Sequence, residues 1–392
     1  MMSVRMKVRL WTVNICRFLL VVVMLPSGFV KLADPMGMVY KLQVYLTHWS
    51  LGVDDLWLKV ATVALGVIEL QLGVYLLLGI RRRTTVWMTL LIMLGFLALS
   101  MYLYIDGGIA DCGCFGAAAE LSPGVTLLKN LILVLVTTYV TIYPQRMRRL
   151  VTERNQGIAT VYVFTYSIVL SLYSLHYLPL VTFTDYRVGE NWVRQYQFGE
   201  EPARDGVVNF ALYDSKGDDV TGKYLNDSAT VFFVTLPNAI KADDSSTDRI
   251  NDLYDFATDH RYRFVGLVGD IADYGDWSDR TGASYDAYSV DEDILKAMVR
   301  SNPGVLLLHK GFLLGKWGTN DLPEIDDVSE LIEQNSTELQ SDFSEHMVWM
   351  RLIVLLGAPL FLLISLDGLW IGRKYRGHKI RMRELLQHKS SV

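Results

Sequence analysis

The chain has 392 residues, enough for two or three ordinary domains, and hydrophobic residues make up 51% of it. A mean hydropathy of +0.24 is too high for a typical soluble protein and too low for a bundle that lies entirely in a membrane. Charge is divided unevenly, because residues 181–347 hold 32 of the 42 acidic residues and only 14 of the 37 basic ones. That segment has a net charge of −18, against −5 for the chain, which indicates two parts in different compartments.

Six stretches are long and apolar enough to cross a bilayer, which takes about 20 residues. They are residues 10–30, 56–80, 85–105, 125–143, 158–179 and 348–371. The first follows basic residues, as a signal peptide does, but no small-residue cleavage site follows its apolar run. We therefore expect a retained helix.

Clusters of Lys and Arg predict the orientation of these spans. They lie at residues 5–9, 81–83, 146–154 and 373–383, which fall on one side of the membrane if six spans alternate. We expect both termini in the cytoplasm, the inner (cytoplasmic) membrane as the location and the lipid bilayer as a partner. Residues 33–55, 106–123 and 181–347 are then periplasmic, where disulfides persist. We expect no nucleic-acid partner.

The acidic segment has the length of one domain and predicts alternating strands and helices. The expected strands are residues 230–235, 262–268, 305–308 and 312–317, and the expected helices are residues 246–260, 291–299 and 325–332. This order resembles the thioredoxin fold, in which Pro303 occupies the place of the cis-proline before a hairpin. We expect Pro303 to be cis and to take part in partner binding.

The thioredoxin resemblance has one important departure. Thioredoxins place a Cys-x-x-Cys motif after the first central strand, but residues 236–239 read LPNA and contain no cysteine. The domain therefore cannot perform dithiol exchange itself, and we interpret it as a binding or recognition domain.

The sequence DCGCFG at residues 111–116 follows the third span and holds two of the three cysteines. Three cysteines are too few for a disulfide framework or a Cys-rich zinc site. A disulfide between Cys112 and Cys114 would close a small, strained ring, which is easily reduced. A thiol–disulfide relay is one interpretation. A static disulfide, a reduced pair in a tight turn and a metal site completed by His48 and Asp111 are the alternatives, although we expect no metal. Cys16 is expected to be a packing residue.

Ionisable residues within the spans are expensive and suggest function. Glu69 lies near the middle of span two and is a candidate proton relay, or else a structural hydrogen-bonding group. Arg17 is a candidate partner, although it lies nearer the cytoplasmic side. We expect Lys31 to extend its amine to the interface and Asp367 to be interfacial.

Three strings support a family resemblance: SGFVKL at residues 27–32, ELQLG at 69–73 and DCGCFG at 111–116. The first two resemble the DoxX family of four-helix membrane proteins. With the third, roughly the first 145 residues resemble the MauE (methylamine utilisation) branch, and the whole chain resembles DoxX-like proteins of Bacteroidota with a C-terminal thioredoxin-like segment.

The resemblance implies a four-helix membrane domain at residues 1–150, a fifth span at 151–180, a thioredoxin-like domain at 181–345, a sixth span at 346–372 and a basic tail at 373–392. It also implies transfer of electrons between thiols and a membrane quinone, with Cys112 and Cys114 as the redox pair. The leading hypothesis is thus a thiol–disulfide redox protein with a periplasmic protein partner. The alternatives are a scaffold or assembly factor for an envelope complex, in which the cysteines are structural, and a transporter subunit.

Overall fold

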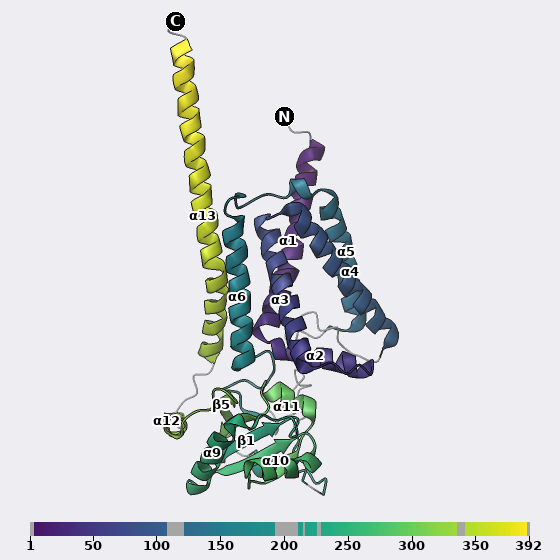
Figure 1. The fold of residues 1–392 in the computed structure, drawn as a ribbon, viewed down its shortest axis with the longest axis vertical. Helices are drawn as coiled ribbons and strands as arrows, with labels where there is room; N and C mark the ends of the chain where they lie inside the picture. The colour runs from purple at the N-terminus through teal and green to yellow at the C-terminus, as the bar shows by residue number, and fades with distance from the viewer. Residues whose placement is uncertain are drawn as a thin grey trace. The chain divides into compact units, whose positions relative to one another are not determined.

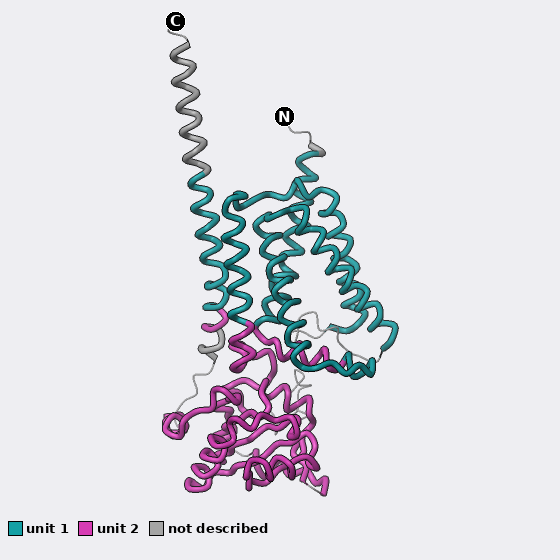
Figure 2. The backbone as a smooth tube through the Cα atoms, in the orientation of Figure 1, with its two compact units in different colours: residues 1–32, 45–170, 350–392 teal, residues 33–44, 171–349 magenta. Residues whose placement is uncertain are grey.

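The computed structural model describes residues 4–107, 121–192, 211–214, 216–225, 229–334 and 342–389. The chain divides into two compact units (Figure 2). Unit 1 contains residues 1–32, 45–170 and 350–392, and unit 2 contains residues 33–44 and 171–349.

Among the described residues, six helices are long and apolar enough to span a membrane, as the sequence predicts. Their apolar spans are Met6–Ala33, Asp55–Leu78, Arg82–Asp106, Pro123–Ile142, Gln156–His176 and Met347–Trp370. The helices are α1 (Val4–Ala33), α3 (Asp55–Leu78), α4 (Arg82–Asp106), α5 (Pro123–Ile142), α6 (Gln156–His176) and α13 (Asp342–Lys389), shown in Figure 1.

Helices α1, α3, α4 and α5 share one apolar core, to which α1 contributes Val13, Leu20 and Met24 and α3 contributes Leu72 and Leu76. A lipid-facing bundle has no hydrophobic driving force between its helices, so close packing is the main source of its stability. In this bundle, small residues such as Gly28 of α1 allow neighbouring helices to approach closely.

Helix α13 runs beside α6, and their contact includes hydrogen bonds from Tyr162 and Tyr166 to the backbone oxygens of Leu355 and Leu352. Asp367 of α13 is 2% exposed and accepts hydrogen bonds from Thr152 and Asn155. The side chain is thus buried among hydrogen-bond donors from the segment between α5 and α6, which stabilise it. That Asp367 lies at the membrane interface stays a prediction.

Helix α2 (Pro35–His48) lies in a segment that the sequence predicts only as a loop. It begins with a capped turn, in which the Asp34 carboxylate accepts the backbone N–H of Gly37 at 2.9 Å and Pro35 occupies the first helical position. Its sequence has few charges and resembles neither a membrane span nor a strongly amphipathic helix.

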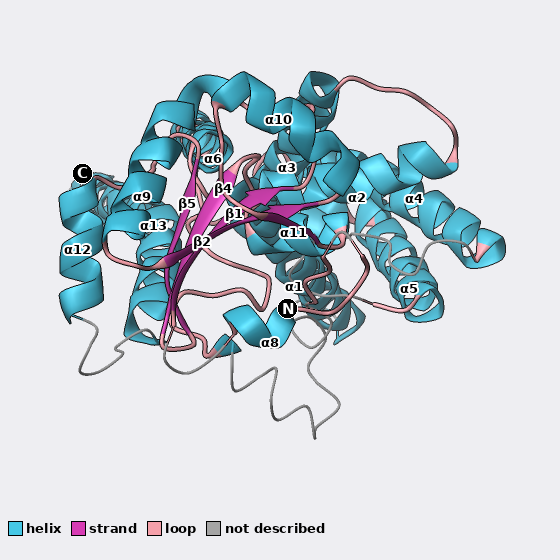
Figure 3. Ribbon diagram, turned by 90° about the horizontal axis from the view of Figure 1, so that it is seen from below, coloured by secondary structure: helices cyan, strands magenta, loops and turns pink. Residues whose placement is uncertain are grey.

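The α/β part of unit 2 contains a five-stranded sheet in the order β3-β2-β1-β4-β5, seen edge-on in Figure 3. The strands are β1 (Thr230–Leu236), β2 (Arg263–Val268), β3 (Ala287–Ser289), β4 (Gly304–His309) and β5 (Phe312–Gly318). Strands β1, β2 and β3 are parallel to one another, and β4 and β5 are antiparallel to their neighbours. The Asn302–Pro303 bond is cis, as expected. This topology, with a cis-proline before the hairpin, is that of a thioredoxin fold.

Each face of the sheet covers a separate core, because side chains alternate along β1. Phe232 and Val234 face helices α9 (Thr247–Asp259), α10 (Tyr274–Thr281) and α12 (Ile325–Gln334). Val231 and Phe233 face α8 (Thr221–Tyr224) and α11 (Glu292–Met298). The described residues also contain three short 3-10 helices: Pro144–Arg146, Asp244–Ser246 and Ile271–Asp273.

The strands and helices predicted in this domain are all present within a few residues of their expected bounds. Strand β3 and helix α10 were not predicted. Strand β3 has only three residues, and α10 is a short helix rich in polar residues, so neither has a clear apolar periodicity.

Candidate functional site

Cys112 and Cys114 lie outside the described residues, in the segment between Asp106 and Pro123 that joins α4 to α5. The site that the structure describes is therefore the one formed by the polar residues of the same four helices. These residues come from the two sequence strings, at 27–32 and 69–73, that carry the resemblance to the DoxX family.

Ser27, Lys31 and Glu69 form a buried cluster between α1 and α3. The Lys31 Nζ atom lies 2.9 Å from Glu69 Oε2, and both side chains are completely buried. Ser27 Oγ donates to the same carboxylate oxygen at 2.7 Å and accepts from Lys31 Nζ at 2.8 Å. The three groups thus form a closed triangle of hydrogen bonds, two of which end on Glu69 Oε2.

The local sequence explains how the cluster forms. Ser27 and Lys31 are four residues apart, so they lie on one face of α1. Between them, Gly28 allows the two helices to approach closely, since a Cβ atom there would lie only 2.4 Å from the backbone nitrogen of Leu70. Glu69 directly precedes Leu70, so this contact brings its side chain opposite Ser27.

Two expectations about this region are wrong. Lys31 does not extend to the interface, because it finds a carboxylate partner within the bundle. Arg17 does not pair with Glu69, because its guanidinium donates instead to the backbone oxygens of Arg148, at 2.6 Å, and Leu77, at 3.4 Å. The position of Arg17 near the cytoplasmic end already counted against that pair.

The cluster leaves one acceptor unused. Within the described part of the chain, Glu69 Oε1 is buried and has no hydrogen-bond partner. A buried charge is expensive unless it is paired, and the pair with Lys31 compensates only one carboxylate oxygen. Among the described residues, Glu69 Oε1 is thus a buried acceptor of this cluster that no hydrogen bond satisfies.

A small cavity lies beside the cluster and is lined by Ser27, Phe96, Lys129 and Asn130, among others. Its volume is about 10 Å³, room for a single water molecule. The cavity therefore does not fit a quinone ring. It does fit a water molecule in contact with the Ser27 side chain.

The remaining polar candidates in unit 1 have local roles. Cys16 packs against the apolar core of the bundle, as expected. His48 Nε2 lies 2.9 Å from Asp106 Oδ2, so the imidazole has a carboxylate neighbour at that end of α4. Asp111, the other residue of the metal alternative, lies outside the described residues. Among the residues that the structure describes, no group of three or more His, Cys, Asp or Glu is arranged to hold a metal ion.

In the α/β domain, the loop with cis-Pro303 lies against the segment that follows β1. Asn302 Nδ2 donates to the backbone oxygen of Asn238 at 2.8 Å, and the backbone oxygen of Asn302 accepts from the backbone N–H of Asp243 at 3.0 Å. This segment is where a thioredoxin carries its cysteines, and here it has none. The partner-binding role of Pro303 stays a prediction.

A second buried ion pair lies within unit 2 and was not predicted. The carboxylate of Asp34 is 3.1 Å from Arg300 Nε and 3.0 Å from Nη2, with side-chain exposures of 3% and 10%. The aromatic ring of Tyr40 lies under both Arg300 and Lys296. The two charged residues are 266 positions apart, so no local pattern in the sequence could reveal their contact.

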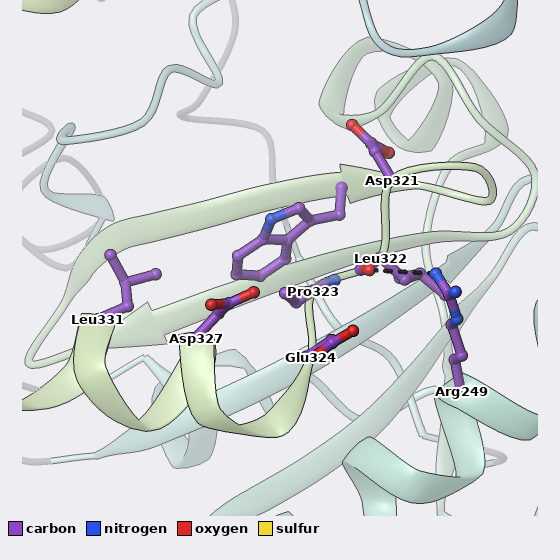
Figure 4. Close-up of a pocket in the computed structure, with 8 residues that line it drawn as sticks. Arg249, Asp321, Leu322, Pro323, Glu324, Asp327 and Leu331 are labelled. Carbon is purple, nitrogen blue, oxygen red and sulfur yellow. Dashed lines mark hydrogen bonds between the residues drawn. The ribbon is translucent and has the colours of Figure 1, made fainter.

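The α/β domain also contains a groove between β5 and α12, with a volume of about 450 Å³ (Figure 4). Its lining includes the indole of Trp317 and three carboxylates, those of Asp321, Glu324 and Asp327. Arg249 of α9 lies at its edge and donates to the backbone oxygen of Leu322 at 3.5 Å. No local pattern in the sequence reveals this groove, because its residues come from three separate elements.

Comparison with known proteins gives one family and one structure. Residues 9–143 match the family described as methylamine utilisation protein MauE, which covers about a third of the chain. The solved structure of the mitochondrial 2-Cys peroxiredoxin from Plasmodium falciparum is similar at 13% identity, covering 33% of this chain and 94% of that one, with a TM-score of 0.24. At that score the likeness adds nothing to the strand order and the cis-Pro303 loop. No curated protein sequence matches the chain.

Proposed function

We propose that this chain, in which residues 9–143 form a MauE family domain, is a thiol–disulfide redox protein of the inner membrane. In this proposal the Cys112–Cys114 disulfide accepts electrons from a partner dithiol, and the α/β domain recognises the partner. The observation that supports it best is the buried Ser27–Lys31–Glu69 cluster in the same domain as the cysteine pair.

Dithiol oxidation requires a place for protons as well as for electrons. In the exchange, a partner thiolate attacks one sulfur of the Cys112–Cys114 disulfide, and the second partner thiol then resolves the mixed disulfide. Two electrons pass to Cys112 and Cys114, and the partner becomes a disulfide. Returning the pair to the oxidised state releases two electrons and two protons.

Glu69 is proposed to handle one of those protons. Its Oε1 atom has no hydrogen-bond partner among the described residues, while Oε2 is held by Lys31 and Ser27. The carboxylate is therefore fixed in position with one oxygen ready for a proton. A water molecule in the small cavity would lie between Ser27 of this cluster and Lys129, and in this proposal it passes the proton on.

A membrane quinone is proposed as the class of electron acceptor. It takes up two electrons and two protons, which matches the balance above. The cavity beside Ser27 does not fit its ring, so we derive no step in which a quinone occupies that cavity.

The proposed orientation places the cysteines and the α/β domain in the periplasm. The basic clusters at residues 5–9, 81–83, 146–154 and 373–383 support it, because all four fall on one side of a six-span arrangement. The surplus of acidic residues in 181–347 supports a location on the opposite side.

Trapping of mixed disulfides tests the proposal. Cys112→Ser and Cys114→Ser variants leave one sulfur unable to complete the exchange, so one of them should hold a partner in a covalent complex that is visible on non-reducing gels. Cys16→Ser is the matched control, because it removes a thiol that packs in the bundle core and leaves the Cys112–Cys114 pair intact. This variant should trap nothing. If neither variant traps a partner and alkylation shows the pair always oxidised in cells, the relay is wrong.

A scaffold role is the second candidate, and the absence of cysteine from residues 236–239 favours it, because the thioredoxin-like domain has no redox chemistry of its own. Deletion of residues 191–342 separates the two. A scaffold loses its partner complex in the deletion and keeps it in the Cys112→Ser/Cys114→Ser double variant, whereas the relay loses function in both.

A further inference from the structure

The groove between β5 and α12 combines an aromatic wall with unpaired negative charge. Trp317 on β5 is half-buried, and Leu322 beside it is 5% exposed. Asp327 and Leu331 come from α12, and Asp321 and Glu324 from the loop that precedes it, as the close-up in Figure 4 shows. A volume of about 450 Å³ falls in the range of sites that bind a side chain or a small molecule.

The three carboxylates of the groove are not neutralised by the domain itself. Asp321, Glu324 and Asp327 form no ion pair with any of the described residues. Asp321 accepts the backbone N–H of Gly318 at 2.6 Å, which fixes its carboxylate. Arg249, the one cation among the described residues that line the groove, donates to the backbone oxygen of Leu322.

The burial of Asp321 also indicates that, among the described residues, the groove lacks a positively charged partner for this carboxylate. Partial burial raises the pKa of its carboxyl above the ordinary value, because desolvation disfavours the charged form. A cation bound in the groove would offset that cost. It would also lie against the indole of Trp317, whose face attracts positive charge.

We propose that this groove binds an arginine side chain from a basic segment of a partner protein. A guanidinium is planar, so it can stack on the Trp317 ring while its N–H groups donate to the carboxylates of Glu324 and Asp327. The surplus of acidic residues across 181–347 steers a basic segment toward the domain. The inference rests on the recognition role proposed above and supplies its chemistry, but it requires neither cysteine.

A metal ion fits this groove less well than a guanidinium. Among the described residues, no three carboxylates, histidines or cysteines lie close enough together to hold a metal. Spread carboxylates around an aromatic face suit an extended planar cation instead.

Fluorine NMR of the full chain in lipid nanodiscs provides the test, with tryptophan replaced by 5-fluorotryptophan. The chain has nine tryptophans, and the Trp317→Phe variant identifies the resonance of Trp317. The probe is a capped pentapeptide with one arginine between glycines. Its control is the same peptide with citrulline, which keeps the shape of arginine but has no charge. We expect the arginine peptide to shift the Trp317 resonance with saturation, and the citrulline peptide to leave it in place.

Charge removal in the groove should weaken binding. We expect the Glu324→Gln/Asp327→Asn variant to raise the Kd of the arginine peptide by roughly twofold to thirtyfold, from two exposed ion pairs. Asp326→Asn is the matched control, because Asp326 lies in the same helix turn but does not line the groove, and it should leave the Kd unchanged.

Three results would overturn the proposal: equal shifts with both peptides, an equal loss of affinity in Asp326→Asn, or displacement of the arginine peptide by calcium ions. Using the Cys112→Ser/Cys114→Ser background keeps the outcomes separate from the relay. A failed relay leaves peptide binding intact in this experiment, and a failed groove leaves mixed-disulfide trapping intact.

Discussion

Two buried ion pairs among the described residues, one in each unit, differ in how completely their carboxylates are hydrogen-bonded. Asp34 in unit 2 uses both oxygens, since Oδ1 accepts from the backbone N–H of Gly37, and Oδ2 accepts from Arg300 Nε and lies 3.0 Å from its Nη2. Glu69 in unit 1 uses only Oε2, and among the described residues Oε1 has no partner.

This difference separates a structural pair from a candidate proton site. A buried polar network that is fully satisfied makes a structure rigid and specific, whereas an unsatisfied buried acceptor needs an explanation. Asp34 and Arg300 connect the start of α2 to the segment just after α11, and both oxygens of Asp34 have a partner. Glu69 instead keeps a free oxygen inside the membrane domain, where unpaired polar groups are most costly.

The largest expected effect is the loss of Lys31. Lys31→Met leaves the Glu69 carboxylate buried without its cation, so unfolding in detergent should become easier by about 3–5 kcal/mol. The double variant Lys31→Met/Glu69→Leu removes both charges and should recover most of that stability. Thermal unfolding followed by circular dichroism measures both. A double variant no more stable than the single one would show that charge pairing does not explain the cost.

Loss of the second pair should cost less. Arg300→Met leaves Asp34 buried, but its carboxylate still accepts the N–H of Gly37, so we expect a loss of about 2–3 kcal/mol. Asp34→Ala removes the helix cap as well as the ion-pair partner, and its cost should exceed that of Arg300→Met by about 1 kcal/mol. Denaturant unfolding monitored by hydrogen exchange in β4 and β1 measures both. Equal costs for the two variants would show that the cap contributes nothing.

Packing between α1 and α3 provides a third comparison. Gly28→Ala forces a methyl group to within 2.4 Å of the Leu70 backbone nitrogen, and overpacking of this kind should cost about 1–3 kcal/mol. Gly95→Ala in α4 is the matched control, because no atom lies within 4 Å of its Cβ position. It should stabilise the helix by up to about 1 kcal/mol. Opposite shifts in melting temperature are the expected result, and a harmless Gly28→Ala would mean that the helices separate easily.

The sequence predicts the elements of this protein well because they depend on local patterns. Runs of about 20 apolar residues predict the six spans, and the short, mostly apolar run at residues 230–235 predicts the buried central strand. Helix α2 and strand β3 were missed because the first has few charges and weak periodicity, and the second is only three residues long.

The sites depend on contacts that no local pattern encodes. Glu69 was identified because an ionisable residue within a span is rare, but its partner was not, since Lys31 lies at the end of a helix where lysines normally reach the interface. Arg300 and Trp317 were missed because their partners are distant in sequence or come from other elements. The opposite holds for Cys112 and Cys114. Their spacing is evident in the sequence, but they lie outside the residues that the structure describes.

The smallest expected effect concerns His309, at the end of β4. Its Nδ1 atom is 2.7 Å from Thr230 Oγ1, and within the described residues its Nε2 atom is buried without a partner. Burial lowers the pKa of His309 below its ordinary value, with a smaller contribution from the neighbouring Lys310. The unfolded chain takes up a proton near pH 6.5, before the folded one does, so stability falls as the pH decreases from about 6.5 toward the lowered pKa.

His309→Gln does not titrate in this range and should remove that part of the pH dependence. We expect the fall in melting temperature between pH 7.5 and 5.5 to shrink by on the order of 1 °C in this variant. His260→Gln, in the same domain, controls for the general loss of a histidine. His309 is thus a third kind of buried group, besides the carboxylates of Asp34 and Glu69. Like Glu69, His309 leaves one buried atom without a partner, but a neutral imidazole bears this far more cheaply than a carboxylate, so its removal should show only as a change with pH.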